Sequence, residues 1–372
     1  MGANLEVKEL IAVRERYDSL QRAPDYKLTI LKIVSIGFPL LLSLECGNED
    51  ATVHVRYIQN AKWSPSNNHI SFLKQEYSYV VRNKSGCGTE SYSGEPLPPP
   101  GYDLYLMNPA RTLEKRIATE FLFTRDEYAW SPHGDEIFYV RRLRGAYFKI
   151  LGTIDTSGSV TVIDTSAAVF DFDWSPDASG IAYSAQHSYS DTVRLYIAPP
   201  AGAPPHLVSD SLPGNVSAVS WSISNQIAFE LAKGSKVYLG IIGADGSGYK
   251  ILDTLNFTYP SIDWSPDGNY LIYIDGGDTS LVAQIFLRDI NSGQNRQVTH
   301  YTSPTSIYSI TFSPDGSKIG YSTGGGLSVV QSDGSGQRQI ASTSYPVEPS
   351  WSADATSLVY ADKDSVIILR VQ

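Results

Sequence analysis

A GxSxG sequence at residues 320–324 is the pattern in this chain that most resembles a nucleophilic catalytic motif. In hydrolases with this motif the serine lies on a sharp turn between a strand and a helix, and an acid and a histidine follow later in the chain. No histidine follows Ser322, and Tyr321 fits the aromatic position of a repeated strand. We therefore interpret the motif as a strand end followed by a turn, and we assign no catalytic residue.

The side chains that bind metals are scattered along the chain. The six histidines are His54, His69, His133, His187, His206 and His300. None of them forms an HxxH or HExxH pair, and the DGSG turns at 245–248 and 333–336 supply too few ligands for calcium. The sequence therefore predicts no metal and no cofactor. Histidines brought together from several repeats would still allow a saccharide lyase or hydrolase site.

Charge and cysteine content exclude further classes of function. The formal net charge is -10, whereas a surface that binds nucleic acid needs clustered Lys and Arg. We therefore expect no nucleic acid partner. The two cysteines, Cys46 and Cys87, exclude a CxxC site and a disulfide scaffold, although one disulfide between them stays open.

An apolar stretch covers residues 28–44, with Lys32 as its one charged residue. Its uninterrupted part, residues 33–44, has the length of a signal-peptide core and is short for a membrane span. We therefore expect an export signal or a membrane anchor, and hence a protein of the cell envelope. The alternative is that residues 5–44 form two helices packed on the main domain, since residues 5–20 read as an amphipathic helix.

Cys46 follows the apolar stretch directly, so lipid attachment must be considered. The preceding residues Ser43, Leu44 and Glu45 do not resemble a lipobox. We place a domain boundary here, with a helical, signal or anchor segment at residues 1–46 and the main domain at residues 47–372.

A repeated motif gives the main domain its organisation. An aromatic residue followed by Ser, usually Pro, and then a turn sequence occurs seven times, beginning at Trp63, Trp130, Trp174, Trp221, Trp264, Phe312 and Trp351. From residue 130 onward the intervals between copies are 39 to 48 residues, the size of one four-stranded β-propeller blade. The sequence therefore predicts an all-β fold of seven blades.

A second pattern follows each motif at a nearly fixed distance. It consists of an apolar residue, one spacer and an aromatic residue, as in Ile70/Phe72, Ile137/Tyr139, Ile181/Tyr183, Ile227/Phe229, Leu271/Tyr273, Ile319/Tyr321 and Leu358/Tyr360. Residues two apart lie on one face of a strand. We therefore expect a buried second strand in each blade, joined to the first by the Ser-Pro-Asp-Gly turn.

The last repeat contains three predicted strands before the chain ends. Residues 52–58 alternate as a strand and precede the first motif. If this strand joined the last blade, it would close the ring and remove an exposed sheet edge. We therefore expect a propeller closed by an N-terminal strand.

These repeats resemble the WD40-like repeats of the TolB family, whose signature is WSPDG followed by an apolar-x-aromatic strand. The resemblance covers about residues 50–372 and implies a propeller that commonly works outside the cytoplasm and binds proteins, peptides or saccharides. TolB itself resembles a two-domain protein, with an α/β domain ahead of a six-bladed propeller. Because this chain differs from that arrangement, we do not expect it to share the partners of TolB. Related propellers also include polysaccharide lyases, so the fold alone does not decide between binding and catalysis.

A long insertion at residues 75–102 makes the first repeat longer than the others. Its aromatic residues Tyr77, Tyr79, Tyr92 and Tyr102, set among Ser, Gly and Pro, have the composition of a recognition loop. A loop without a partner is the alternative, because long loops cost little stability. We expect a non-catalytic scaffold that binds a protein, peptide or saccharide, with a saccharide lyase or hydrolase as the alternative function.

Overall fold

The computed structural model describes residues 31–35, 38–42, 50–82, 102–121, 128–142, 149–188, 192–200, 203–208, 212–256, 261–276, 282–343 and 345–371. Every regular element in these ranges is a β strand. The chain divides into two compact units, the first of residues 1–56 and 76–97 and the second of residues 57–75 and 98–372.

The first unit contains a short antiparallel pair. Strands β1 (Leu31–Ser35) and β2 (Phe38–Leu42) pair so that Leu31 lies opposite Leu42. A helical segment is thus not shown at these residues, and residues 5–20 and Cys46 lie outside the described ranges. Among the described residues, no helix is long and apolar enough to cross a membrane.

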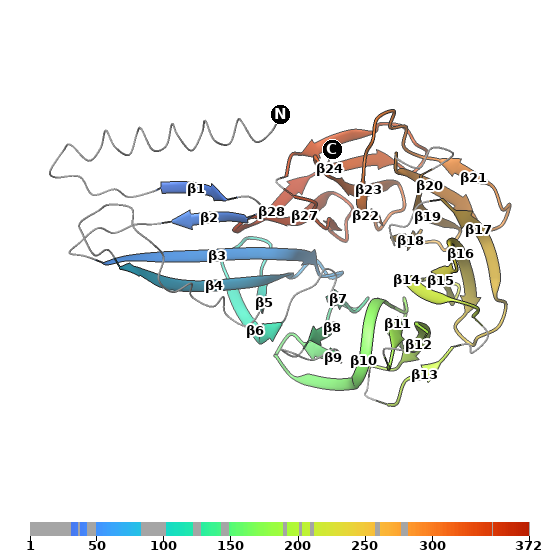
Figure 1. The fold of residues 1–372 in the computed structure, drawn as a ribbon, viewed down its shortest axis with the longest axis horizontal. Coiled ribbons are helices and arrows are strands. Elements are labelled where there is room, and N and C mark those ends of the chain that lie inside the picture. Colours follow the sequence, from blue (N-terminus) through green and yellow to red (C-terminus); the bar gives the residue numbers. More distant parts are fainter. Residues whose placement is uncertain are drawn as a thin grey trace. The chain divides into compact units, whose positions relative to one another are not determined.

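The second unit contains seven blades arranged in a ring, and blades two and three share one seven-stranded sheet (Figure 1). Blade one contains β3 (Asp50–Trp63) and β4 (Ile70–Arg82), of which residues 50–56 and 76–82 belong to the first unit, together with β5 (Tyr102–Met107) and β6 (Glu114–Phe121). Blade two contains β7 (Tyr128–Trp130), β8 (Glu136–Arg142), β9 (Lys149–Asp155) and the first half of β10 (Val160–Trp174). Blade three contains the second half of β10, β11 (Ile181–Gln186), β12 (Arg194–Ala198) and β13 (His206–Leu207).

The remaining blades repeat this order. Blade four contains β14 (Asn215–Trp221), β15 (Gln226–Lys233), β16 (Lys236–Gly243) and β17 (Lys250–Leu255). Blade five contains β18 (Ile262–Trp264), β19 (Tyr270–Asp275), β20 (Gln284–Asp289) and β21 (Asn295–Gln297). Blade six contains β22 (Ile307–Phe312), β23 (Lys318–Thr323), β24 (Gly326–Gln331) and β25 (Arg338–Ala341). Blade seven contains β26 (Ser350–Trp351), β27 (Ser357–Asp362) and β28 (Ser365–Arg370).

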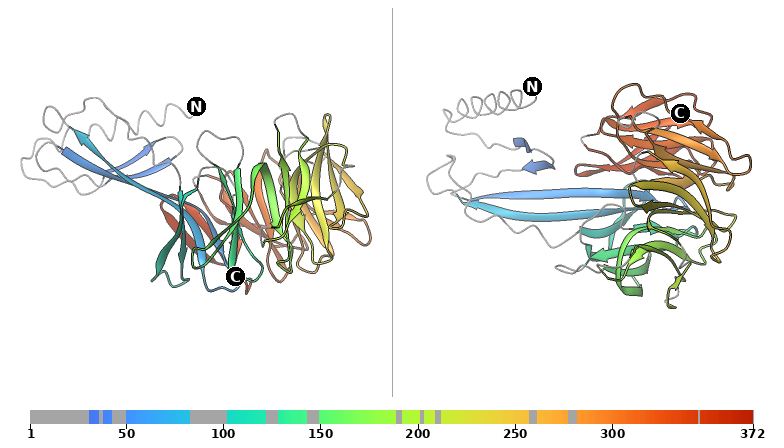
Figure 2. Two further views of the ribbon diagram at one scale, coloured as in Figure 1. Left: turned by 90° about the horizontal axis from the view of Figure 1, so that it is seen from below. Right: turned by 45° about the vertical axis from the view of Figure 1, so that its right-hand side comes forward.

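The strands of each blade run from the centre of the ring outward, so that β14, β18 and β22 lie innermost and β13, β17 and β21 lie outermost (Figure 1). Neighbouring blades stand side by side around the ring (Figure 2). Because the strands form an antiparallel meander, the turns between first and second strands and between third and fourth strands lie on one face. We call this face the turn face.

The Ser-Pro-Asp-Gly motif forms the predicted hairpin. In blade five the backbone N–H of Gly268 donates to Ser265 O at 2.8 Å, and Gly268 has a φ of 69°, which glycine adopts without strain. The Ser265 hydroxyl accepts the N–H of Tyr270 at 2.9 Å and donates to Asp267 at 2.5 Å. The motif therefore closes the turn and fixes its aspartate at the same time.

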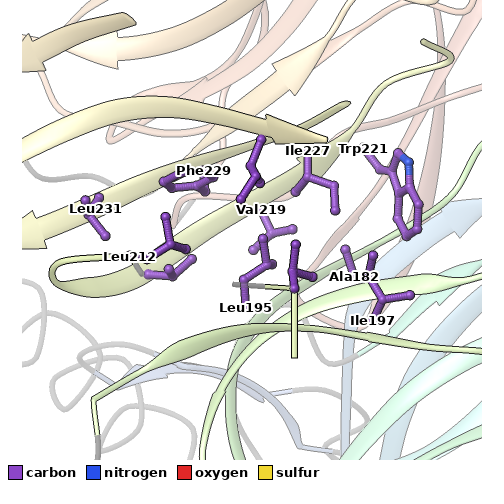
Figure 3. Packing of buried hydrophobic residues seen from close by; sticks show 12 residues of the cluster. Ala182, Leu195, Ile197, Leu212, Val219, Trp221, Ile227, Phe229 and Leu231 are labelled. Atoms are coloured by element: carbon purple, nitrogen blue, oxygen red, sulfur yellow. The ribbon is translucent and has the colours of Figure 1, made fainter. Parts of the chain in front are cut away.

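The predicted apolar and aromatic pairs on the second strands are buried in all seven blades. Neighbouring blades share their apolar clusters, and the one between blades three and four is shown in Figure 3, with Trp221 and Phe229 of blade four facing Leu195 and Ile197 of blade three. Stacking of sheets, each too thin to bury both faces alone, therefore forms the core.

Closure by an N-terminal strand is not shown. Residues 52–58 lie within β3, which is the first strand of the blade-one sheet, and the sheet of blade seven has three strands among the described residues. One backbone bond, from Ile58 N to Lys363 O at 3.0 Å, joins the two sheets there. Packing closes the ring instead, because Trp63 and Phe72 of blade one share a cluster with Val359 and Val366 of blade seven.

Candidate functional site

The innermost strands carry polar side chains that cross from one blade to the next. At every second joint, the residue before the motif aromatic accepts the N–H of the motif aromatic in the following blade. The pairs are Asp173 Oδ2 with Trp221 N at 2.8 Å, Asp263 Oδ2 with Phe312 N at 2.8 Å, and Ser350 Oγ with Trp63 N at 3.0 Å. These acceptors satisfy backbone donors that the free inner edge of a sheet would otherwise leave unpaired.

The intervening joints use the motif tryptophan instead. Its indole N–H donates to a backbone carbonyl of the preceding blade, in the pairs Trp174 with Ala129 O at 3.2 Å, Trp264 with Ser220 O at 3.1 Å, and Trp351 with Thr311 O at 3.4 Å. The two kinds of contact therefore alternate around the ring.

Seven blades cannot alternate without a break, and the break falls at the joint between blades one and two. There Lys62 Nζ donates to Tyr128 O at 2.9 Å and lies over the Tyr128 ring, while the Trp130 indole donates to Ser71 Oγ at 2.9 Å. Lys62 Nζ also lies 3.9 Å from Glu348 of blade seven. This lysine thus links three blades near the axis.

The carboxyls on the axis have raised pKa values. Burial raises the pKa of Asp173 to about 6, although the N–H of Trp221 and the charge of Lys62 oppose the shift. Burial raises the pKa of Asp263 to about 7; the N–H of Phe312 opposes this and the charge of Asp173 adds to it. Both groups therefore take up protons close to neutral pH.

Glu230 on β15 is a third buried acid. Its side chain is 1 % exposed, Ser217 Oγ donates to it at 3.4 Å, and burial raises its pKa to about 8. The equivalent positions in the other blades hold Leu73, Val140, Ser184, Ile274, Ser322 and Ala361. Glu230 is thus the one acidic residue at this position among the seven blades, and the equivalent positions do not form a ring of acids.

Within the described ranges, no group of three or more His, Cys, Asp or Glu side chains is placed to hold a metal ion. His187 Nε2 lies 3.3 Å from Asp164 and its ring contacts Tyr196 edge-on, while His69 stacks on Trp130. The described axial carboxyls Asp173 and Asp263 serve as backbone caps between blades. The hydrogen bonds of Asp173 and Asp263 to Trp221 N and Phe312 N are therefore contacts between blades.

Ser322 of the GxSxG sequence lies in β23, paired with Leu327, and is fully buried. This placement confirms the interpretation of the motif as a strand end. Its hydroxyl has no hydrogen-bond partner among the described residues.

We expect Ser322→Ala to leave the free energy of unfolding unchanged or to raise it by up to about 1–2 kcal/mol, because it removes a buried, unpaired hydroxyl. Urea unfolding monitored by tryptophan fluorescence measures this change. Ser328→Ala, which also removes a buried hydroxyl from the same blade, is the comparison. A loss of more than about 1 kcal/mol would mean that Ser322 has a partner.

A groove of about 530 Å³ lies on the turn face between blades five and six. Leu287 and Phe312, both largely buried, form its floor, and Tyr270 is 37 % exposed at its wall. Its polar lining includes Asp267, Asp289, Asp315, Asp333 and Arg296. The volume falls within the range of ligand sites in proteins.

Turn geometry fixes the carboxylates of this groove. Asp289 Oδ1 accepts the N–H groups of Asn291 and Ser292, each at 2.9 Å, and Asp333 Oδ1 accepts the N–H of Ser335 at 2.8 Å. The N–H of Ser292 leads the lowering of the pKa of Asp289. The hydroxyl of Ser335, followed by its N–H, lowers the pKa of Asp333, and the charge of Arg296 adds to this effect.

Asp267 and Asp315 belong to the Ser-Pro-Asp-Gly turns, where the hydroxyls of Ser265 and Ser313 donate to them at 2.5 Å each. Their pKa values are also lowered, for Asp267 chiefly by that hydroxyl and for Asp315 by the turn hydrogen bonds despite partial burial. All four carboxylates are therefore ionised at neutral pH and held in place before any ligand arrives.

The candidate tyrosines of the insertion have different places. Tyr77 and Tyr79 belong to β4, but their side chains, like the whole of Tyr92, lie outside what the structure describes. Tyr102 is the first residue of β5 and is 5 % exposed in the cluster between blades one and two. Tyr102 is therefore a core residue and is not available to a ligand at the surface.

Sequence reasoning identified the Asp333 turn but missed the groove. The signal for the groove was an aspartate that opens the turn between the third and fourth strands in blades five and six. This signal can be interpreted only when it is known that the two turns, 44 residues apart in the chain, line the same groove.

The ring of WSPDG-type blades defines the chain as a β-propeller. The family profile described as the TolB beta propeller domain matches residues 144–367. The chain belongs to this family, which confirms the resemblance seen in the repeats. No curated protein matches the chain in sequence.

Solved structures share the fold at low sequence identity. An oligogalacturonate lyase in complex with manganese is 14% identical, with a TM-score of 0.60 over 93% of this chain and 97% of that chain. An oligogalacturonate lyase from Vibrio parahaemolyticus is 13% identical, with a TM-score of 0.61 over 93% and 98%. A putative TolB from Agrobacterium tumefaciens is 17% identical, with a TM-score of 0.51 over 72% and 96%. At these identities the similarity is one of fold.

Proposed function

We propose that this protein is a non-catalytic scaffold that binds a protein or peptide partner on the turn face of its propeller. The observation that carries the proposal is the groove between blades five and six, where fixed carboxylates surround an apolar floor beside the exposed ring of Tyr270. Apolar contact with a few fixed polar groups is the usual construction of a binding site.

The state of the axial acids supports binding over catalysis. Asp173 and Asp263 each accept a backbone N–H of the next blade, so moving either group toward a substrate would leave that donor unpaired. The acids in the groove, by contrast, use only the N–H and hydroxyl groups of their own turns and face an open cavity.

We place the protein in the cell envelope. The apolar residues 28–44 and the membership of the TolB propeller family support this location. We further propose that Tyr77, Tyr79 and Tyr92 of the insertion offer a second contact surface. Fractionation of cells that express the full chain tests the location, since recovery from the cytosolic fraction alone would contradict it.

Capture with the full chain tests the binding function. The tagged protein is incubated with envelope and whole-cell extracts, and the bound proteins and released small molecules are identified by mass spectrometry. We expect one reproducible protein or peptide partner. Recovery of a shortened oligosaccharide in place of a protein would overturn the proposal.

A saccharide lyase or hydrolase is the alternative function. It is favoured by the fold shared with two oligogalacturonate lyases over nearly the whole of both chains. Incubation with oligogalacturonate, with and without added manganese, tests it through the ultraviolet absorbance of unsaturated products. We expect no product above that formed by a heat-denatured sample, and turnover would favour the alternative.

A further inference from the structure

We propose that the groove between blades five and six binds an extended peptide segment through its arginine or lysine side chains. This inference rests on the proposed binding function and specifies the chemistry of the partner at that site.

The charge of the groove favours a cationic partner. Its lining holds four aspartates, Asp267, Asp289, Asp315 and Asp333, against the single cation Arg296. A cation that enters this groove meets carboxylates on both walls, one pair from the Ser-Pro-Asp-Gly turns and one pair from the outer turns. Hydrogen bonds between charged groups are about twice as strong as neutral ones.

Preorganisation reduces the cost of binding. The carboxylates of Asp289 and Asp333 are oriented by N–H groups of their own turns. A carboxylate has about four acceptor positions, so each of them retains capacity for a guanidinium or ammonium donor. Because these side chains are already ordered, little conformational entropy is lost when a ligand binds.

The uncharged parts of the groove suit the stem of a long cationic side chain. Leu287 and Phe312 provide apolar lining, and Tyr270 adds a partly exposed aromatic ring, a group that attracts cations. An extended peptide fits better than a small free cation, because the groove combines an apolar floor with four separated charges and no metal-binding cluster lies in the described part of the chain.

Arg296 shows how a guanidinium is held at this place. Its Nη2 donates to Ser332 O at 2.6 Å, and its charge contributes to the lowered pKa of Asp333. The positive charge of Arg296 therefore neutralises part of the negative charge that would attract a cationic ligand. We infer that Arg296 competes with the ligand and weakens its binding.

Fluorescence anisotropy with the full chain tests the inference. The probe is a fluorescein-labelled octapeptide of alternating Arg and Ser, and the same peptide with Gln in place of Arg is the uncharged comparison. We expect saturable binding of the Arg peptide that weakens as the salt concentration rises, and no saturable binding of the Gln peptide. Equal binding of both peptides would overturn the inference.

Matched variants locate the binding. The double variant Asp289→Asn with Asp333→Asn keeps an oxygen that can accept the turn N–H groups, and we expect it to weaken binding at least tenfold. The control is Asp155→Asn with Asp245→Asn, which makes the same charge change in equivalent turns of blades two and four. The control is expected to change affinity less than threefold, and equal loss in both pairs would overturn the inference.

Arg296→Ala gives a result of opposite sign. It removes the competing guanidinium, so we expect binding of the Arg peptide to strengthen by about threefold or more. Weaker binding by this variant would contradict the role given to Arg296. Spermine added as a competitor distinguishes a peptide site from one for free polyamines, because displacement of the peptide at micromolar spermine would overturn the peptide assignment.

The inference and the proposed function fail separately. If the full chain and the Asp289→Asn, Asp333→Asn variant capture the same envelope partner equally well, the binding function stands and the groove assignment is wrong. If neither captures a partner, the binding function itself is wrong.

Discussion

Replacing Trp264 with alanine is expected to lower the free energy of unfolding by roughly 3–5 kcal/mol, the usual cost of truncating a large buried aromatic side chain. Trp264 is 6 % exposed and packs between blades four and five against Ala218, Leu239 and Tyr273. Truncation leaves a cavity at the joint and also removes the indole donor to Ser220 O. Equilibrium unfolding in urea, followed by circular dichroism, measures the loss.

Two further substitutions separate the contributions at this joint. Trp264→Phe keeps one aromatic ring and loses the indole donor and part of the buried volume, so we expect a smaller loss, of about 1–3 kcal/mol. Blade six carries Phe312 at the equivalent position, which shows that a ring without the donor is accommodated. Ile223→Ala, at a side chain that is 64 % exposed, is expected to change stability by less than about 0.5 kcal/mol. An unchanged unfolding midpoint for Trp264→Ala would contradict the packing role.

Replacing Asp263 with asparagine is expected to raise stability at pH 8 relative to the wild type, by roughly 1–4 kcal/mol, and to change it little near pH 4. The folded-state pKa of Asp263 is raised to about 7 from an ordinary value of 3.8. Between these two pH values the folded state holds a proton that the unfolded state has released, so wild-type stability falls as the pH rises through this window. Asparagine is always neutral and keeps an oxygen for the N–H of Phe312.

The size of this gain is limited because Asp263 is only half-buried, and partial exposure to solvent reduces the penalty of ionisation. The matched control is Asp177→Asn on the turn face. The pKa of Asp177 is lowered to about 2 by hydrogen bonds, of which the one from the Ser175 hydroxyl has the largest effect. The ionised carboxylate of Asp177 stabilises the folded state, whereas that of Asp263 destabilises it. The stabilisation by Asp177 is present above pH 4 and is lost as the pH falls toward 2. Urea midpoints at pH 5 and pH 8 measure both variants, and a gain for Asp263→Asn that is equal at both pH values would contradict the shifted pKa.

Much of the fold could be predicted because each blade carries its own local signals. The turn that follows Trp264 and the buried pair Leu271 and Tyr273 depend on residues a few positions apart, and the structure confirms both. Turn chemistry and period-two burial act within one hairpin, so a sequence reading can find them.

The missed features depend on distant parts of the chain. Strand β10 runs unbroken from Val160 to Trp174 and serves two blades. The caps formed by Asp173 and Asp263 need the next blade to supply an N–H. Nothing local distinguishes these aspartates from solvent-exposed ones.

The same limit applies to the candidate site. The residues that precede Tyr102 in the sequence have the composition of a recognition loop. The pairing of β5 with β4 and β6 nevertheless places the ring of Tyr102 in the core. Asp289 and Asp333 read as ordinary turn residues, and only the stacking of blades five and six makes them walls of one groove.

Site-specific photo-crosslinking tests the central claim, that the groove is where a partner binds, most directly. A benzophenone amino acid is placed at position 270 in the groove, or at position 249, where a tyrosine is similarly exposed but does not line the groove. The full chain is then irradiated in its own cells. We predict a discrete adduct of higher mass from position 270 and none from position 249, whereas adducts of equal yield from both positions, or no adduct from position 270, would contradict the account.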